Sequence, residues 1–316
     1  MPSQTTDSNA LQTILGSGGS IGVELAKALP AYTNRIRLVS RNPKKVNETD
    51  ELMPADLTKA DDIDRAVAGS AIVYVTVGFE YSTKVWQATW PPFIRHVIDA
   101  CIRHQAKLVF FDNIYMYDPE HLGHLTEETP NRPTSKKGEV RKEVAEMIME
   151  GINSGKLTAL IARAADFLGP KNSVIEEMVH KNFLKGKKAD WFASTDKLHN
   201  FTFTPDAGKA TALLGNTPDA YNQVWHLPTD RTPLTGKDWV DLFAKEMNVA
   251  PKVQAIPVWL LSVLGIFIPI MREFKEMSYQ YDRDYVFDSS KFEKRFDFKP
   301  TTPQEAVKAV VNGMEV

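Results

Sequence analysis

The sequence predicts an α/β fold, a doubly wound parallel sheet with a smaller C-terminal lobe. Two observations carry this prediction. Apolar segments of strand length alternate with amphipathic segments through the first half of the chain, and a glycine-rich turn joins the first of them to a helix. Strands that alternate with helices pair in parallel through right-handed crossovers. The second half of the 316 residues is less regular and supplies the second lobe.

Each element follows from its residue pattern. The first strand is predicted at 11–15, and the helix after it places Ile21, Leu25 and Leu29 on one face. The other strands of the first half are predicted at 35–40, 51–57, 71–78, 107–112 and 157–164. One helix is predicted to end near 69, and another to run over about 134–151. Between them a helix is predicted over 93–105, with Pro91 and Pro92 at its start, where a missing N–H costs no hydrogen bond.

Glycine is concentrated between the first strand and the first helix. Gly16, Gly19 and Gly22 follow the spacing G-x-x-G-x-x-G, and Gly18 is an additional glycine. In this setting the first glycine makes the tight turn, the second lets a pyrophosphate approach the backbone, and the third lets helix and strand pack closely. The free N–H groups at the helix start, near Ser20 and Ile21, would hold the phosphates. The turn therefore predicts a dinucleotide-binding (Rossmann) domain, with a glycine turn that binds no ligand as the alternative.

The end of the second strand indicates which dinucleotide binds. A site for NAD has Asp or Glu there to hold the ribose hydroxyls. Here Ser40 is followed by Arg41, which can hydrogen-bond a 2′-phosphate that a carboxylate would repel. NADP is therefore predicted in preference to NAD, unless Arg41 only begins a solvated helix. The ends of the third and fourth strands supply the remaining predicted cofactor contacts, Asp56, Leu57, Val77 and Gly78.

Composition limits the partners and the compartment. The formal net charge of -2 gives no general attraction to nucleic acid, and a single cysteine, Cys101, fits a reducing compartment. The first ten residues are polar and show no secretory signal, so a cytoplasmic protein is expected. The apolar run 255–270 is too short to span a bilayer, although a membrane-surface segment is an alternative to a buried helix. His121 and His124 have no third ligand in sight, so no metal is predicted.

Several motifs together resemble the extended short-chain dehydrogenase/reductase family, the group named for NAD-dependent epimerases and dehydratases. They are "GSGGSIG", "SRN", "ADL", "FFDNIYMYDP", "TEETPNRPTSKKGEVRKEVAE", "RAADFLGP" and "HNFTFTPDAGKA", and they cover nearly the whole chain. The resemblance implies hydride transfer to or from a small molecule. It also implies a homodimer formed partly by helices such as 92–104 and 136–151.

The family's catalytic residues are altered in this sequence. The family uses a Ser or Thr with a Tyr-x-x-x-Lys pair, and the matching positions hold Asn113, Lys137 and Arg141. A lysine beside a second cation can have a lowered pKa, so Lys137 is one candidate proton donor. Tyr117, beyond the strand at 107–112, is the other. The alternatives are that Tyr117 packs structurally and that Lys137 is an exposed basic residue.

The resemblance and the sheet topology place a substrate at the carboxyl edge of the sheet. Residues 1–166, with 201–215 and 223–227, are expected to form the dinucleotide-binding domain, and 167–200 with 228–316 the substrate-binding lobe. The expected substrate contacts are Tyr81, Trp86, Asp166 and Asn200. The predicted function is an NADP-dependent oxidoreductase or epimerase acting on a small carbonyl, hydroxyl or nucleotide-sugar-like substrate. The alternative is a non-catalytic NADP-binding sensor or regulatory protein.

Overall fold

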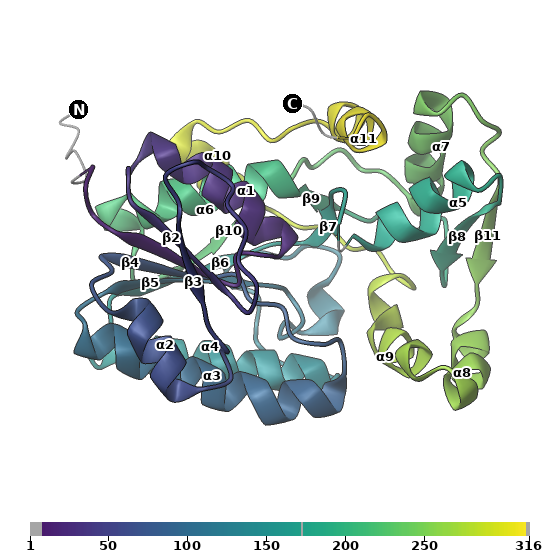
Figure 1. The fold of residues 1–316 in the computed structure, drawn as a ribbon. Helices are drawn as coiled ribbons and strands as arrows, with labels where there is room; N and C mark the ends of the chain where they lie inside the picture. The colour runs from purple at the N-terminus through teal and green to yellow at the C-terminus, as the bar shows by residue number, and fades with distance from the viewer. Residues whose placement is uncertain (1–7, 172, 314–316) are drawn as a thin grey trace.

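A seven-stranded parallel sheet forms the centre of the molecule in the computed structural model, which describes residues 8–171 and 173–313 (Figure 1). The strand order is β10-β6-β5-β4-β1-β2-β3, so the predicted doubly wound fold is confirmed. The strands are β1 (Gln12–Leu15), β2 (Ile36–Ser40), β3 (Glu51–Pro54), β4 (Ile72–Val75), β5 (Lys107–Asp112), β6 (Ala159–Arg163) and β10 (Val224–His226). Residues 1–7, which include most of the polar stretch at the N-terminus, lie outside the described residues.

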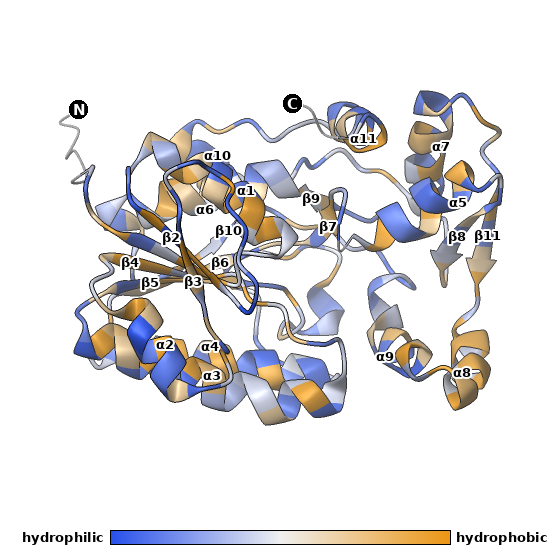
Figure 2. Ribbon diagram, viewed as in Figure 1, coloured by the Kyte–Doolittle hydropathy of each residue, from blue (hydrophilic) through white to orange (hydrophobic). Residues whose placement is uncertain are grey.

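Helices cover both faces of this sheet (Figure 1). One face carries α2 (Ala60–Val67), α3 (Thr83–Arg103) and α4 (Lys136–Asn153). The other carries α1 (Ser20–Ala28), α6 (Thr204–Gly215) and α10 (Ser290–Phe296). The strands between them are mostly apolar (Figure 2), as a sheet buried on both faces requires.

The helix α3 begins about ten residues before the predicted start. Pro91 and Pro92 therefore lie inside the helix and not at its first turn, and that part of the prediction is wrong. Each proline removes one backbone hydrogen bond. The early turns nevertheless bury Trp86 and Trp90, whose rings contact each other edge to face, and this aromatic packing outweighs the lost bonds.

A second lobe is built from the chain after β6. Two small parallel sheets pair β7 (Asp166–Leu168) with β9 (Phe201–Phe203), and β8 (Ala189–Phe192) with β11 (Val253–Ile256). Its helices are α5 (Lys181–Leu184), α7 (Gly236–Glu246), α8 (Val258–Phe267), α9 (Pro269–Met277) and α11 (Pro303–Val311). Five shorter helical segments complete the fold, η1 (Leu29–Ala31), η2 (Pro119–His121), the π-helical η3 (Glu176–His180), η4 (Pro218–Ala220) and η5 (Ser278–Gln280).

The segment 201–215 was expected to return to the large sheet as a strand and a helix. Its helix α6 does pack on that core, against α1. Its strand β9 instead pairs with β7 in a separate two-stranded sheet. The large sheet ends on that side at β10, which occupies the place beside β6. None of the helices in the described ranges is long and apolar enough to cross a bilayer.

Candidate functional site

The glycine loop follows β1, and two of its glycines are required by the packing of the protein itself. Gly16 has φ +96°, and a Cβ on it would lie 2.6 Å from the backbone N of Val77. A Cβ on Gly22 would lie 2.6 Å from the carbonyl oxygen of Gly16. These close approaches hold the turn between β4 and the first turn of α1, in the roles that the spacing predicts.

Gly18 and Gly19 are different, because the protein does not fill the space beside them. A Cβ on Gly18 would meet nothing within 4 Å, and one on Gly19 would reach its nearest neighbour only at 3.7 Å. Gly19 is the N-cap of α1 and supplies no side-chain cap to the helix. The buried hydroxyl of Ser17 also has no partner in the described residues. This cradle fits a pyrophosphate, which would accept from the N–H groups at Ser20 and Ile21.

The carboxyl ends of β2 and β3 meet beside this loop. Ser40 is the last residue of β2, and Arg41 after it is exposed. Asp56, beyond β3, accepts hydrogen bonds from the hydroxyl of Thr58 at 2.7 Å and from its N–H at 3.1 Å. These bonds lower the pKa of the Asp56 carboxyl, and the nearby cations, Arg41 among them, add to the effect. Arg41 therefore lies close to Asp56 while its guanidinium stays open to solvent.

The other residues predicted to line the cofactor differ in exposure. Leu57 is a buried core residue, so its side chain supports the strand end from behind. Val77 is half-buried, and its backbone lies against Gly16. Gly78 is exposed and has open space where a side chain would stand. Val77 and Gly78 thus form a surface at the end of β4 beside the glycine loop.

Asn113 stands directly after β5. Its Oδ1 accepts from the N–H of Tyr115 at 3.1 Å, and its own N–H donates to Oδ1 of Asp112 at 2.9 Å. The side chain therefore fixes the turn that presents Tyr115 at the carboxyl edge.

Tyr117 is packed inside the protein, which is the structural alternative to its prediction as a proton donor. The side chain is 1% exposed, and its hydroxyl lies 2.7 Å from Nε2 of His226. Nδ1 of His226 lies 2.9 Å from the carbonyl oxygen of Asp288, which can only accept, so Nδ1 carries the proton. Nε2 is then the acceptor and Tyr117 donates to it. Burial raises the pKa of Tyr117 to about 12, and Arg163 lies over its ring at 4.7 Å.

Lys137 is neither exposed nor paired with a second cation. Its side chain is 0% exposed, and Nζ donates to Glu276 at 2.6 Å and forms an ion pair with Glu273, both from α9. Burial opposes ionisation of the two carboxyls, but the bonds from Lys137 outweigh it and lower the pKa of each. The sequence predicts this lysine beside a second cation or exposed to solvent. Two carboxylates hold its charge instead.

Arg141, one turn further along α4, is also held by a carboxylate. Its Nε donates to Asp112 at 2.8 Å, and the other oxygen of Asp112 pairs with Arg163 at 3.3 Å. The guanidinium lies 4.4 Å from the ring of Trp90. Arg141 is 3% exposed, and it joins β5, α4 and α3 inside the protein.

Four tyrosines lie near Asp166, and we call them the tyrosine cluster: Tyr281 and Tyr285 from the second lobe, and Tyr81 and Tyr115 from the large sheet. Asp166 accepts from Tyr281 at 3.0 Å and pairs with Nε2 of His199 at 3.0 Å. The ring of His199 is stacked between Tyr281 and Tyr285. His199 begins the motif "HNFTFTPDAGKA", whereas Tyr281 and Tyr285 lie in a segment without a motif, so no sequence signal pointed to these two tyrosines.

The side of the cluster that belongs to the large sheet contains Tyr81 and Tyr115. Their hydroxyls are 3.4 Å apart, and Trp86 stacks on Tyr115 with 17° between the rings. Burial raises the pKa of both tyrosines. Tyr81, Trp86 and Asp166 are thus brought to one region. Trp86 is itself almost fully buried.

Asn200 has a structural position. Its Oδ1 accepts from the N–H of Phe287 at 2.9 Å, and its Nδ2 donates to the carbonyl of Asp230 at 3.3 Å. Both bonds hold the C-terminal segment on the second lobe. The side chain is 4% exposed, so its predicted contact with a substrate is not supported.

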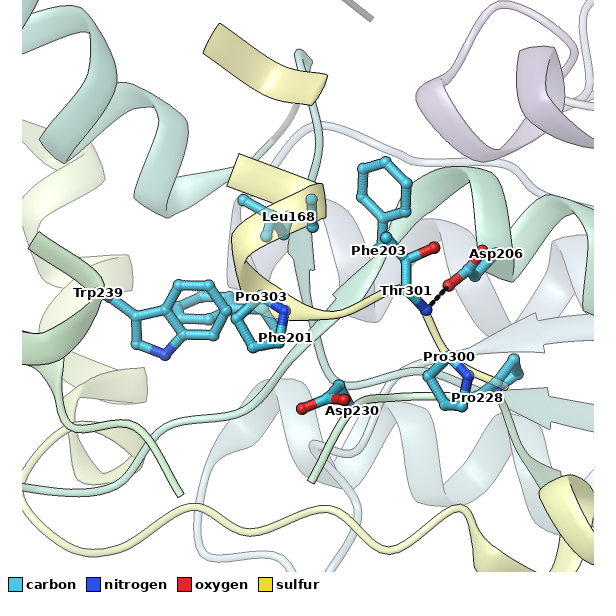
Figure 3. A pocket seen from close by; sticks show the side chains of 11 residues that line it. Leu168, Phe201, Phe203, Asp206, Pro228, Asp230, Trp239, Pro300, Thr301 and Pro303 are labelled. Carbon is cyan, nitrogen blue, oxygen red and sulfur yellow. Dashed lines mark hydrogen bonds between the residues drawn. The ribbon is translucent and has the colours of Figure 1, made fainter. Parts of the chain in front are cut away.

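Two hollows lie away from this region. A cavity of about 10 Å³ is enclosed by β7, β9 and the start of α11, where Asp206 accepts from the N–H of Thr301 at 2.7 Å (Figure 3). It has room for about one water molecule. A larger hollow of about 410 Å³ lies among α1, α6 and α11. Neither is lined by the glycine loop or the tyrosine cluster, and no group of three His, Cys, Asp or Glu that could hold a metal occurs in residues 8–171 and 173–313.

Residues 16–154 match a family model described as NAD(P)H-binding. No curated protein sequence matches the chain. One similar solved structure is a dTDP-glucose 4,6-dehydratase from Streptomyces venezuelae with NAD and TYD bound, at 14% identity over 95% of each chain and a TM-score of 0.78. A second is a UDP-glucuronic acid 4-epimerase from Bacillus cereus with NAD, at 15% identity over 96% of each chain and a TM-score of 0.78. A third is a UDP-glucose 4-epimerase from Thermus thermophilus with NAD, at 17% identity over 96% of this chain and 99% of that one, with a TM-score of 0.76.

At these identities the structures establish the fold, and the family model establishes the nature of the first domain. The fold predicted from the motifs is therefore confirmed: the chain has the fold of these dehydratase and epimerase structures, and residues 16–154 match an NAD(P)H-binding domain.

Proposed function

We propose that this protein is an NADP-dependent oxidoreductase or epimerase that acts on a small carbonyl, hydroxyl or nucleotide-sugar-like substrate. The observation that carries the proposal is the open cradle over Gly18 and Gly19, with Arg41 and no Asp or Glu directly after β2. Arg41 would hold the 2′-phosphate, and the N–H groups at the start of α1 would hold the pyrophosphate. The names of the similar structures support the substrate class.

The chemistry of the bound cofactor would be hydride transfer. The chain's own part is to orient the substrate oxygen, and Tyr81 and Tyr115 suit this role. A tyrosine hydroxyl is protonated at neutral pH, so each can donate a hydrogen bond to a carbonyl or hydroxyl oxygen. Tyr117 and Lys137 are less suitable, because each is buried and bonded within the protein. This moves the proposed proton donor from those two residues to the Tyr81–Tyr115 pair.

Binding of the two dinucleotides tests the cofactor part of the proposal. Dissociation constants for NADPH and NADH would be measured by calorimetric titration of the parent, of Arg41→Ala and of Arg35→Ala. Arg35 precedes the other end of β2 and is also exposed, so it is a matched control. Losing one charge-assisted hydrogen bond costs roughly 1.5–3 kcal/mol, so Arg41→Ala should weaken NADPH binding by about 10- to 100-fold. Tighter binding of NADH than of NADPH by the parent would contradict the choice of NADP.

A second candidate function is a non-catalytic NADP-binding sensor or regulatory protein. The specific observation in its favour is that both cations at the altered catalytic positions are held in ion pairs, Lys137 by Glu273 and Glu276, and Arg141 by Asp112. Oxidation of NADPH with a panel of aldehydes, ketones and nucleotide sugars separates the two functions. Turnover that Tyr115→Phe lowers by at least tenfold supports the enzyme. Tight NADPH binding without turnover on any of the panel supports the sensor.

The division into lobes and the assembly also remain proposals. We assign residues 1–166, with the helix at 204–215 and the segment at 223–227, to the dinucleotide-binding domain, and the rest, β9 included, mainly to the substrate-binding lobe. A cytoplasmic homodimer is the expected form, with α3 and α4 at the interface.

A further inference from the structure

The helical hairpin formed by α8 and α9 exposes an unusual amount of apolar surface. Five of the nine large apolar side chains that are exposed in the described residues lie within 259–268. They are Trp259, Val263, Ile266, Phe267 and Ile268, with exposed fractions of 43–80%. Figure 2 shows the apolar colour along most of α8. A contiguous patch of this kind marks an interaction surface.

The exposed side chains form one face of α8. Trp259, Val263 and Ile266 follow the spacing i, i+4, i+7, which aligns them along a helix. The opposite face carries Leu261 and Gly265, the buried positions of this helix. The helix α8 therefore has a buried face towards the protein and an apolar face towards solvent.

Two features hold the hairpin in shape. A Cβ on Gly265 would lie 2.8 Å from Cγ of Arg272, so the two helices approach closely at this glycine. Nη2 of Arg272 donates to the carbonyl of Ile266 at 3.3 Å, at the end of α8, where carbonyls have no partner in the helix. The tip at Ile266–Ile268 is thereby fixed with its side chains in solvent.

Charge is divided between the two sides of the hairpin. On α9 the acidic residues Glu273 and Glu276 face the protein, where both bind Thr83 and Lys137. The basic residues Arg272 and Lys275 are exposed. The sequence from 255 to 272 contains no Asp or Glu. An apolar strip with the exposed basic side chains of Arg272 and Lys275 beside it is complementary to an anionic lipid surface.

We propose that the α8–α9 hairpin binds the surface of an anionic membrane. The rings and aliphatic side chains of α8 insert among the lipid headgroups, while Arg272 and Lys275 lie at the level of the phosphates. With 10 residues, α8 lies along the surface and does not cross it. A second copy is the less favourable occupant, because a two-fold contact on this patch would bring the same basic side chains together.

Flotation with lipid vesicles tests the inference on the full chain. Vesicles of phosphatidylcholine alone and of phosphatidylcholine with 30% phosphatidylserine (about a third anionic lipid) would be compared. We expect the parent to float with the anionic vesicles and to bind them at least about fivefold more tightly than the neutral ones. Phe267→Glu should lower this binding at least tenfold. Leu184→Glu should not, since Leu184 is as exposed as Trp259 but lies at the end of α5.

Three results would overturn the proposal. The parent could remain unbound with both vesicle types, it could bind both equally, or Leu184→Glu could lose binding as fully as Phe267→Glu. Sedimentation velocity without lipid identifies the competing occupant: a dimer of the parent that Phe267→Glu dissociates, with no vesicle binding, assigns the patch to a second copy. Circular dichroism and NADPH titration of each variant show whether it is folded, and these measurements do not depend on the membrane.

Discussion

At the scale of single residues, the glycine loop contains two kinds of glycine. Gly16 and Gly22 are needed because neighbouring backbone occupies the place of a side chain. Gly18 and Gly19 leave open space beside the start of α1. The first kind supports the fold and the second kind leaves room for a ligand, so substitutions at the two kinds should fail in different measurements.

Gly19→Val should therefore abolish NADPH binding and leave the protein folded. A valine there would fill the cradle, and a Cβ at this position has no protein neighbour closer than 3.7 Å. Gly22→Val should instead lower the melting temperature, because its Cβ would lie 2.6 Å from the carbonyl oxygen of Gly16. Gly123→Val, at a glycine with open space far from the loop, is the control. Unchanged NADPH affinity in a folded Gly19→Val protein would mean that the loop is only a turn.

The tyrosines near the carboxyl edge of the sheet also differ in role: Tyr117 supports the fold, and Tyr115 is proposed to contact the substrate. Tyr117→Phe should leave turnover and NADPH affinity nearly unchanged, but it should lower stability by about 1–3 kcal/mol, because Nε2 of His226 loses its donor in a buried place. Tyr115→Phe removes a hydroxyl that bonds only to Tyr81 in the described residues, so it should cost little stability. Denaturant unfolding and steady-state rates on an identified substrate measure the two effects. A tenfold loss of turnover in Tyr117→Phe would restore that residue as the proton donor.

At the scale of elements, α9 explains why Lys137 could not be understood from the sequence. Its partners Glu273 and Glu276 are about 140 positions away along the chain, and no local pattern connects them with α4. Local patterns did predict the strands of the sheet, the glycine turn and the helix α4. They failed at the start of α3, because the aromatic packing of Trp86 and Trp90 outweighs the usual effect of two prolines. They also failed where a single side chain depends on long-range partners, as with Tyr117 and His226.

The contact between α9 and α4 gives a prediction about that element. In Glu273→Gln/Glu276→Gln, Lys137 is left as a buried cation without a carboxylate, which typically costs about 3–5 kcal/mol. We expect faster amide exchange in α9 and a lower melting temperature, with little change in the central strands. Adding Lys137→Met removes the unpaired charge and should recover most of the lost stability. Exchange in α9 as slow as in the parent would show that the ion pairs do not hold this helix.

At the scale of the whole molecule, His226 joins parts of the chain that are far apart in sequence. It ends β10 at the margin of the large sheet, and its ring stacks on Phe287 at 4.0 Å. Its two nitrogens bond to Tyr117, after β5, and to Asp288, in the C-terminal segment. All these groups are bonded to a neutral imidazole, so charging this one ring affects the sheet and the C-terminal segment together.

Burial lowers the pKa of His226 from 6.5 to about 3, and the cation of Arg163 adds to the shift. On this ring the unfolded chain therefore binds a proton near pH 6.5, whereas the folded chain binds it only near pH 3. Above pH 6.5 the ring is neutral in both states and contributes no pH dependence. As pH falls from 6.5 towards 3, it lowers the free energy of unfolding by up to about 1.4 kcal/mol per pH unit. His226→Gln should be less stable at pH 7, but its side chain cannot titrate. When the free energy of unfolding is measured with denaturant at several pH values, we expect its slope against pH to be smaller in this variant by about this amount. Equal slopes in the parent and in His226→Gln would show that the ring is not held neutral between the two parts of the chain.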